Sequence, residues 1–188
     1  ETKDTKDIEI VPWIDDAPKN SMTMTLNKLR QKVKKKKAWA MFEMGRRYQF
    51  RNGVVLSLEK AIDYYKKGTE LGDPRCMDAL GYMYDKGEGV AVNKKLAFEY
   101  FQMAAFKGFD VAQHNLGDCY RVGIYVDQSN IKAREWYNRA ATQGFEHAVK
   151  ELKILDEKEK TEEEEKEKEE EEEERQPRIN GSTFKIEK

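Results

Sequence analysis

The chain has 188 residues, of which 38% are hydrophobic and another 38% are charged. An ordinary globular protein is about one quarter charged, so this sequence is rich in charge and poor in core-forming residues. No apolar run approaches the roughly 18 residues of a membrane-spanning helix, so no transmembrane segment is expected. The net charge is only −1 because a basic stretch near one end and an acidic stretch near the other offset each other.

The two cysteines, Cys76 and Cys119, are far apart in the sequence and form no Cys-x-x-Cys motif. A disulfide framework is therefore not expected, and a reducing compartment is favoured. We expect a cytoplasmic or nuclear protein. The sequence begins at Glu1 rather than Met, so the lack of a visible signal segment is weak support for that expectation.

Residues 1–20 are mostly polar, apart from an apolar island at residues 8–14. Pro12 and Pro18 oppose helix formation in this segment. The segment is predicted to be a flexible arm. The alternative is that Trp13 and its apolar neighbours dock on the body of the protein or on another protein.

An N-terminal capping helix is predicted over residues 21–37. Its apolar residues Leu26, Leu29 and Val33 recur at helical spacing and form a narrow stripe. The segment also carries a basic patch of seven cations without an acid, which are Lys28, Arg30, Lys32, Lys34, Lys35, Lys36 and Lys37. The basic patch is interpreted as a solvated face, as a nuclear import signal, or, less favoured, as a surface for nucleic acid or an anionic membrane.

A unit of 36 residues occurs three times, over residues 38–73, 74–109 and 110–145. A shift by 36 positions aligns seven columns without a gap, including Ala40 with Cys76 and Ala112, Tyr65 with Phe101 and Tyr137, and Gly72 with Gly108 and Gly144. Self-similarity at such a period is typical of helical repeat proteins, in which each unit packs only on its neighbours.

Each unit is predicted to contain a helix A and a helix B, joined by a loop that contains glycine. Helix A is expected at residues 39–50, 75–86 and 111–122, and helix B at residues 58–71, 94–107 and 130–143. The first helix A has a buried stripe of Ala40, Met44 and Tyr48. Gly45 interrupts this helix at a cost of about 0.5–1 kcal/mol relative to Ala, and glycine recurs there in the other units. We therefore expect helix B to approach too closely for a Cβ atom.

The units follow the pattern Ala-x-x-x-Leu-Gly-x-x-Tyr, then Gly-x-Gly-Val, then Lys-Ala-x-x-Tyr-Tyr-x-x-Ala-Ala-x-x-Gly. This pattern closely resembles the Sel1-like repeat, a family related to tetratricopeptide repeats, over about residues 38–148. The resemblance implies an all-α fold, a right-handed α-solenoid of helix-turn-helix repeats with a 36-residue period, acting as an adaptor between proteins. The third loop has Tyr125 where glycine is usual, so its conformation is expected to differ.

A solenoid exposes an apolar face at each end unless a cap covers it. Residues 146–158, with Ala148, Leu152 and Leu155, are predicted to be the C-terminal capping helix. Residues 159–188 form a Glu-rich tail, predicted either to extend that helix through Glu–Lys pairs four residues apart or to be disordered. The tail is interpreted as a solubilising end or as a mimic of nucleic acid that recruits basic proteins.

The sequence offers little for catalysis. The only histidines, His114 and His147, lack the spacing of metal ligands, and Cys119 lacks the local signature of a catalytic thiol. No phosphate-binding loop, nucleophile elbow or dinucleotide fingerprint is present. We therefore expect no enzyme, no metal site and no cofactor.

A binding surface is expected instead on the face of each helix A that points away from the buried stripe. In the related tetratricopeptide fold, helix A lines the concave surface. The predicted partner-binding residues are Trp39, Phe42, Arg46, Gln49, Asp78, Tyr82, Asp85, His114, Asp118 and Arg121. Two alternatives remain open: Trp39, Phe42 and Phe50 pack against the capping helix, and Arg46, Tyr82 and His114 are ordinary surface residues.

The sequence therefore predicts a monomeric, non-enzymatic scaffold that binds a peptide or partner domain on its concave face. The alternative is a nucleic-acid- or chromatin-associated factor that acts through the Lys-rich cap and the acidic tail.

Overall fold

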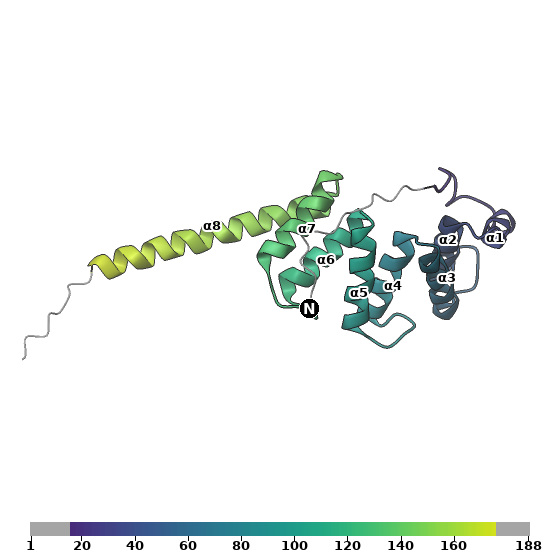
Figure 1. The fold of residues 1–188 in the computed structure, drawn as a ribbon, viewed down its shortest axis with the longest axis horizontal. Coiled ribbons are helices and arrows are strands. Elements are labelled where there is room, and N and C mark those ends of the chain that lie inside the picture. The colour runs from purple at the N-terminus through teal and green to yellow at the C-terminus, as the bar shows by residue number, and fades with distance from the viewer. Residues whose placement is uncertain (1–15, 176–188) are drawn as a thin grey trace, which may run out of the picture. The chain divides into compact units, whose positions relative to one another are not determined.

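The computed structural model describes residues 16–175, with side chains up to residue 172. The apolar island with Trp13 and the tail beyond residue 175 lie outside the described residues. All regular structure in the described part is helical, as Figure 1 shows. The helices are α1 (Leu26–Lys34), α2 (Ala38–Gln49), α3 (Leu58–Glu70), α4 (Pro74–Lys86), α5 (Lys94–Phe106), α6 (Asp110–Val122), α7 (Asn130–Thr142) and α8 (Glu146–Arg175).

The chain divides into two compact units, residues 1–152 and 153–188. The first unit holds α1 to α7 and the beginning of α8. The second unit holds the rest of α8, and residues 156–172 of this Glu-rich helix are exposed. The described part of the acidic tail is therefore helical.

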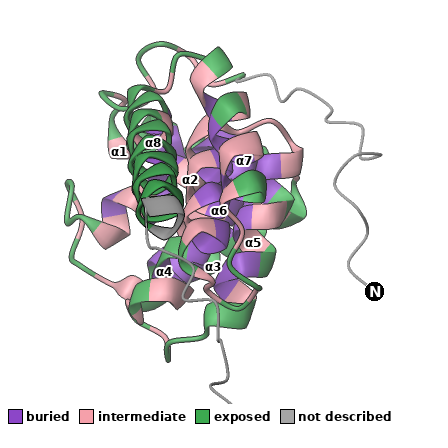
Figure 2. Cartoon of the chain, turned by 90° about the vertical axis from the view of Figure 1, so that its left-hand side faces the viewer, coloured by how far each residue is buried: buried purple, intermediate pink, exposed green. Residues whose placement is uncertain are grey.

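The three repeats are the helix pairs α2–α3, α4–α5 and α6–α7. Each helix A packs on the helix B of its own unit, and each helix B packs on the helix A that follows it. The buried residues follow these helices, as the purple segments in Figure 2 show. The predicted all-α solenoid with a 36-residue period is confirmed, and the repeat helices begin and end close to the predicted residues.

Side-chain caps define the starts of most repeat helices. The side chains of Ser57, Asp73, Asn93 and Ser129 accept hydrogen bonds from backbone N–H groups in the first turns of α3, α4, α5 and α7. Each such cap satisfies one of the donors that a helix N-terminus leaves unpaired, worth typically about 1 kcal/mol.

The mid-helix glycines confirm the predicted close approach of helix B. A Cβ atom on Gly45, Gly81 or Gly117 would collide with the aromatic ring of helix B in the same unit. The prediction for the third loop is wrong at its central residue. Tyr125 has a φ of 66°, close to the 73° of the equivalent Gly89, so the loop keeps the left-handed conformation without glycine.

The N-terminal helix α1 is shorter than predicted, because it begins at Leu26 rather than near residue 21. Residues before it form turns, and the carbonyl groups of Met22 and Met24 accept hydrogen bonds from the guanidinium of Arg47 in α2. The segment before α1 is therefore hydrogen-bonded to the first repeat through Arg47. Leu29 of α1 is fully buried against the first helix A.

Candidate functional site

A groove of about 390 Å³ lies along α2, α4 and α6, the A helices of the three repeats. These helices contact one another in succession, which brings their outward faces onto one surface. Five of the predicted binding residues line the groove, and they are Phe42, Arg46, Gln49, Asp78 and Tyr82. They share one face of each helix because they are spaced three or four residues apart.

Phe42 lies close to two guanidinium groups. The guanidinium carbon of Arg75 is 5.1 Å from the centre of the Phe42 ring, and that of Arg46 is 5.9 Å from it. The ring of Tyr65 in α3 packs beside Phe42 with centroids 6.1 Å apart. Phe42 is half-buried and packs on the core between α3 and α4, so one wall of the groove combines an aromatic face with positive charge.

The two arginines differ in how tightly their charge is neutralised. Arg75 donates to both oxygens of Asp73, over 3.0 Å and 2.7 Å, and the Asp73 side chain is 1% exposed. In the part of the chain that the structure describes, Arg46 pairs with one carboxylate, that of Glu43, at 3.9 Å. The same Glu43 accepts a hydrogen bond of 3.1 Å from the buried Arg47. Arg46 therefore shares its counter-charge with a second cation.

The side-chain amide of Gln49 forms hydrogen bonds on both sides at the end of the groove near the first loop. The hydroxyl of Tyr65 donates to Oε1 of Gln49 over 2.7 Å, and Nε2 of Gln49 donates to Glu88 over 3.0 Å. Burial raises the pKa of Tyr65, so this hydroxyl stays protonated and acts as the donor. Gln49 is thus held in one orientation between an aromatic hydroxyl and a carboxylate.

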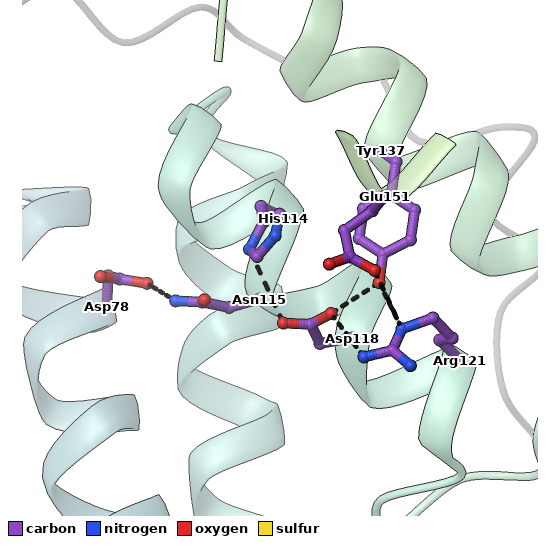
Figure 3. Close-up of polar contacts among 7 residues, drawn as sticks. All are labelled: Asp78, His114, Asn115, Asp118, Arg121, Tyr137 and Glu151. Carbon is purple, nitrogen blue, oxygen red and sulfur yellow. Dashed lines mark hydrogen bonds and ion pairs between the residues drawn. The ribbon is translucent and has the colours of Figure 1, made fainter. Parts of the chain in front are cut away.

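A carboxyl–amide pair joins α4 to α6 in the groove. Nδ2 of Asn115 donates to Oδ1 of Asp78 over 2.8 Å (Figure 3). Although the residue as a whole is half-buried, burial of the carboxyl group raises the pKa of Asp78 to about 7. The hydrogen bond from Asn115 opposes this rise, and the negative charge of Asp110 adds to it. Asp78 is thus partly protonated near neutral pH.

The predicted residues of the third repeat, His114, Asp118 and Arg121, do not line this groove. They form a separate cluster, shown in Figure 3, in which the hydroxyl of Tyr137 donates to Asp118 over 2.6 Å. Arg121 donates to the same hydroxyl over 3.1 Å and lies 3.5 Å from Glu151. His114 Nδ1 is 3.7 Å from Asp118. Tyr137, Asp118 and Arg121 are therefore hydrogen-bonded to one another.

Two further predicted binding residues also lie outside the groove. Trp39 is 4% exposed and belongs to the core beneath α1, so the alternative of packing against the capping helix is correct for this residue. Asp85 lies outside the groove and forms ion pairs with Lys86 and Lys94 at 2.8 Å and 2.7 Å. Burial works to raise the pKa of Asp85, but the hydrogen bonds from these lysines outweigh it and hold the pKa below its ordinary value.

Several groove residues were missing from the predicted set, among them Tyr65, Glu88, Phe109 and Asn115. Tyr65 belongs to a repeated aromatic column and is 1% exposed, yet it also lines the groove. Glu88 and Phe109 lie in connections between helices, so the helical spacing that was used to predict the binding face could not identify them. Phe50, at the end of α2, lines the groove and is 64% exposed.

The basic patch stands apart from the groove. Six of its seven cations are exposed, and Lys32 is half-buried. Within residues 16–175, none of the seven forms an ion pair. Their charge is therefore available to solvent or to an anionic partner.

The remaining reactive side chains show no catalytic arrangement. Cys76 and Cys119 are free and buried, and burial raises the pKa of Cys76 and brings that of Cys119 to about 12. Both are therefore thiols rather than reactive thiolates. No cluster of His, Cys, Asp and Glu among the described residues could hold a metal ion. No helix in the described ranges is long and apolar enough to cross a membrane.

Comparison with known proteins identifies the family of the repeats. The family model described as the Sel1 repeat matches residues 40–73, 74–109 and 110–145. A Sel1 repeat protein from Oxalobacter formigenes is 38% identical in sequence, with a TM-score of 0.63, over 69% of this chain and 97% of that chain. A protective antigen of uropathogenic Escherichia coli with an SLR fold is 28% identical, with a TM-score of 0.58, over 70% of this chain and 36% of that chain.

Cysteine-rich protein B of Helicobacter pylori shares the fold, with 18% identity and a TM-score of 0.56 over 73% of this chain and 98% of that chain. No curated protein is detectably similar to the chain.

Proposed function

Because the chain belongs to the Sel1 repeat family, whose members are generally non-catalytic scaffolds for protein–protein interaction, we propose that it holds a peptide segment or partner domain in the groove along α2, α4 and α6. The observation that carries the proposal is an aromatic surface left open on the A helices. Tyr82 is 43% exposed and Phe50 is 64% exposed, and both line the groove.

This composition favours a protein ligand. Aromatic residues and arginine are enriched at the centres of protein interfaces, where they bury a large area at a small entropic cost. The groove combines these residue types with amide groups held in fixed orientations by Tyr65 and Asp78. Such fixed donors and acceptors suit the backbone of a bound segment, because little ordering is needed on binding.

Site-specific cross-linking in the full chain tests the proposal. A photoreactive amino acid replaces Tyr82 in the groove or, as the matched control, Met103 in α5, which is 45% exposed and does not line the groove. We expect a partner from the native cell to cross-link at position 82 and not at position 103. Equal cross-linking at both positions, or none at position 82, would count against the groove.

A further inference from the structure

Most charged and amide side chains of the groove are already paired with other described residues, and Arg46 is paired only loosely. Gln49 bonds to Tyr65 and Glu88, Asn115 bonds to Asp78, and Arg75 is held by both oxygens of Asp73. Arg46 is different, because among the described residues its only ion pair is a single contact of 3.9 Å with Glu43. Its side chain remains 37% exposed at the groove wall.

Glu43 cannot turn toward Arg46 without losing a better partner. Its side chain is 7% exposed and accepts a hydrogen bond of 3.1 Å from Arg47. Arg47 is itself fixed by the carbonyls of Met22 and Met24. Arg46 and Arg47 thus share the carboxylate of Glu43, and Arg47 holds it more closely. The charge of Arg46 is therefore only loosely neutralised.

The rest of the groove limits what an anion at Arg46 can be attached to. Phe42 carries the Arg46 guanidinium over its ring, and Tyr82 and Phe50 offer partly exposed aromatic surface in the same groove. Glu88 and Asp78 also line the groove and oppose a ligand with many negative charges. The surface therefore suits one acidic group flanked by apolar groups rather than a polyanion such as nucleic acid.

We propose that the groove binds an extended peptide in which an aspartate or glutamate pairs with Arg46 and a neighbouring apolar or aromatic side chain packs on Phe42 and Tyr82. This inference rests on the proposed function and names its ligand class. A guanidinium can bind a carboxylate through two parallel hydrogen bonds, a geometry that the single contact with Glu43 leaves unused. The groove crosses three helices, which favours an extended segment over a compact one.

Selection from a displayed library of short random peptides on the immobilised full chain tests the ligand class. We expect the selected sequences to be enriched in aspartate or glutamate next to an aromatic or aliphatic residue. Binding should weaken about tenfold in the Arg46→Gln variant. The matched control is Arg30→Gln, which removes an exposed arginine of α1 outside the groove and should leave binding unchanged.

Exchange of the peptide's acid for its amide tests the same contact in the unaltered protein, so the result does not depend on how well Arg46→Gln folds. The loss should match that of Arg46→Gln. Peptides that need Tyr82, as judged by Tyr82→Ala, but show no acidic enrichment would overturn this inference and leave the proposed function standing. Peptides whose binding is indifferent to Tyr82→Ala would overturn both.

Discussion

The ring of Tyr137 lies so close to Gly117 that a Cβ atom on residue 117 would come within 2.6 Å of the ring carbon Cδ1. The same relation recurs between Gly81 and Phe101, at 2.7 Å. Real Cβ atoms essentially never approach another heavy atom to under 3.0 Å, so either the ring or the helix would have to move. This contact therefore sets the distance between helix A and helix B in a repeat.

Gly117→Ala is expected to destabilise the protein by roughly 1–3 kcal/mol through overpacking, even though alanine favours a helix. Urea unfolding followed by circular dichroism measures the change. The control is a double-mutant cycle with Tyr137→Ala, in which the cost of the alanine at residue 117 should shrink because the ring is gone. An equal cost in both backgrounds would show that the ring is not the cause.

Asp78 should make stability depend on pH. Its pKa is raised from 3.8 to about 7 in the folded chain, so the folded state binds the proton more tightly than the unfolded state does. Stability from this group is fully present below about pH 4 and is lost as the pH rises toward 7. In Asp78→Asn, this fall should be absent, and the variant should be more stable than the parent at pH 8.

Urea unfolding at pH 5 and pH 8 measures this effect. Asp63→Asn is the matched control, because Asp63 is 69% exposed and pairs only with the exposed Lys67 among the described residues. The control should keep the pH dependence of the parent. If Asp78→Asn keeps it as well, the slope has another origin.

Tyr137→Phe should cost more stability than Tyr65→Phe. The hydroxyl of Tyr137 donates to the carboxylate of Asp118, whereas that of Tyr65 donates to the neutral amide of Gln49. Hydrogen bonds to charged groups contribute about 1.5–3 kcal/mol and neutral ones about 0.5–1.5 kcal/mol. Asp118 is 35% exposed and keeps some hydration, so the lower end of its range is expected. Thermal unfolding of the two variants side by side gives the comparison, and the reverse order would contradict it.

The basic patch is expected to support only weak, non-specific binding to duplex DNA. With at most seven phosphate contacts, the slope of log K against log salt should be no steeper than about −6. Replacement of Lys34, Lys35, Lys36 and Lys37 by glutamine should abolish this binding, and Tyr82→Ala should leave it unchanged. Fluorescence anisotropy with labelled DNA at several salt concentrations measures both. Tight binding that survives high salt would favour the nucleic-acid alternative.

The repeat made most of the fold predictable. Equivalent residues meet equivalent neighbours in every unit. The recurrence of glycine at positions 45, 81 and 117 therefore predicted that a Cβ atom there would collide with helix B. The outward face of helix A followed from helical rotation alone, which placed Phe42, Arg46 and Tyr82 in the groove.

The features that the sequence did not predict depend on contacts that occur in one repeat and are not repeated 36 residues away. Trp39 lies on the predicted face, but α1 covers it, and the sequence does not say where α1 crosses α2. Asp85 is neutralised by Lys94 from the start of the next helix. Tyr125 keeps a glycine-like conformation, with its ring beside Phe98 at 6.0 Å between centroids. Each case is decided by a particular neighbour rather than by the repeat.

The hydrogen bonds of Arg47 make the autonomous folding unit longer than the region that matches the family. A fragment trimmed to residues 40–145 would keep Arg47 and Glu43 but lose the carbonyls of Met22 and Met24. It would also lose Leu29 and leave Met44 open to solvent. A buried cation without its acceptors is costly, so this fragment should melt at a lower temperature and less cooperatively than one that starts at residue 16. Homology boundaries would therefore be a poor guide for subcloning this protein.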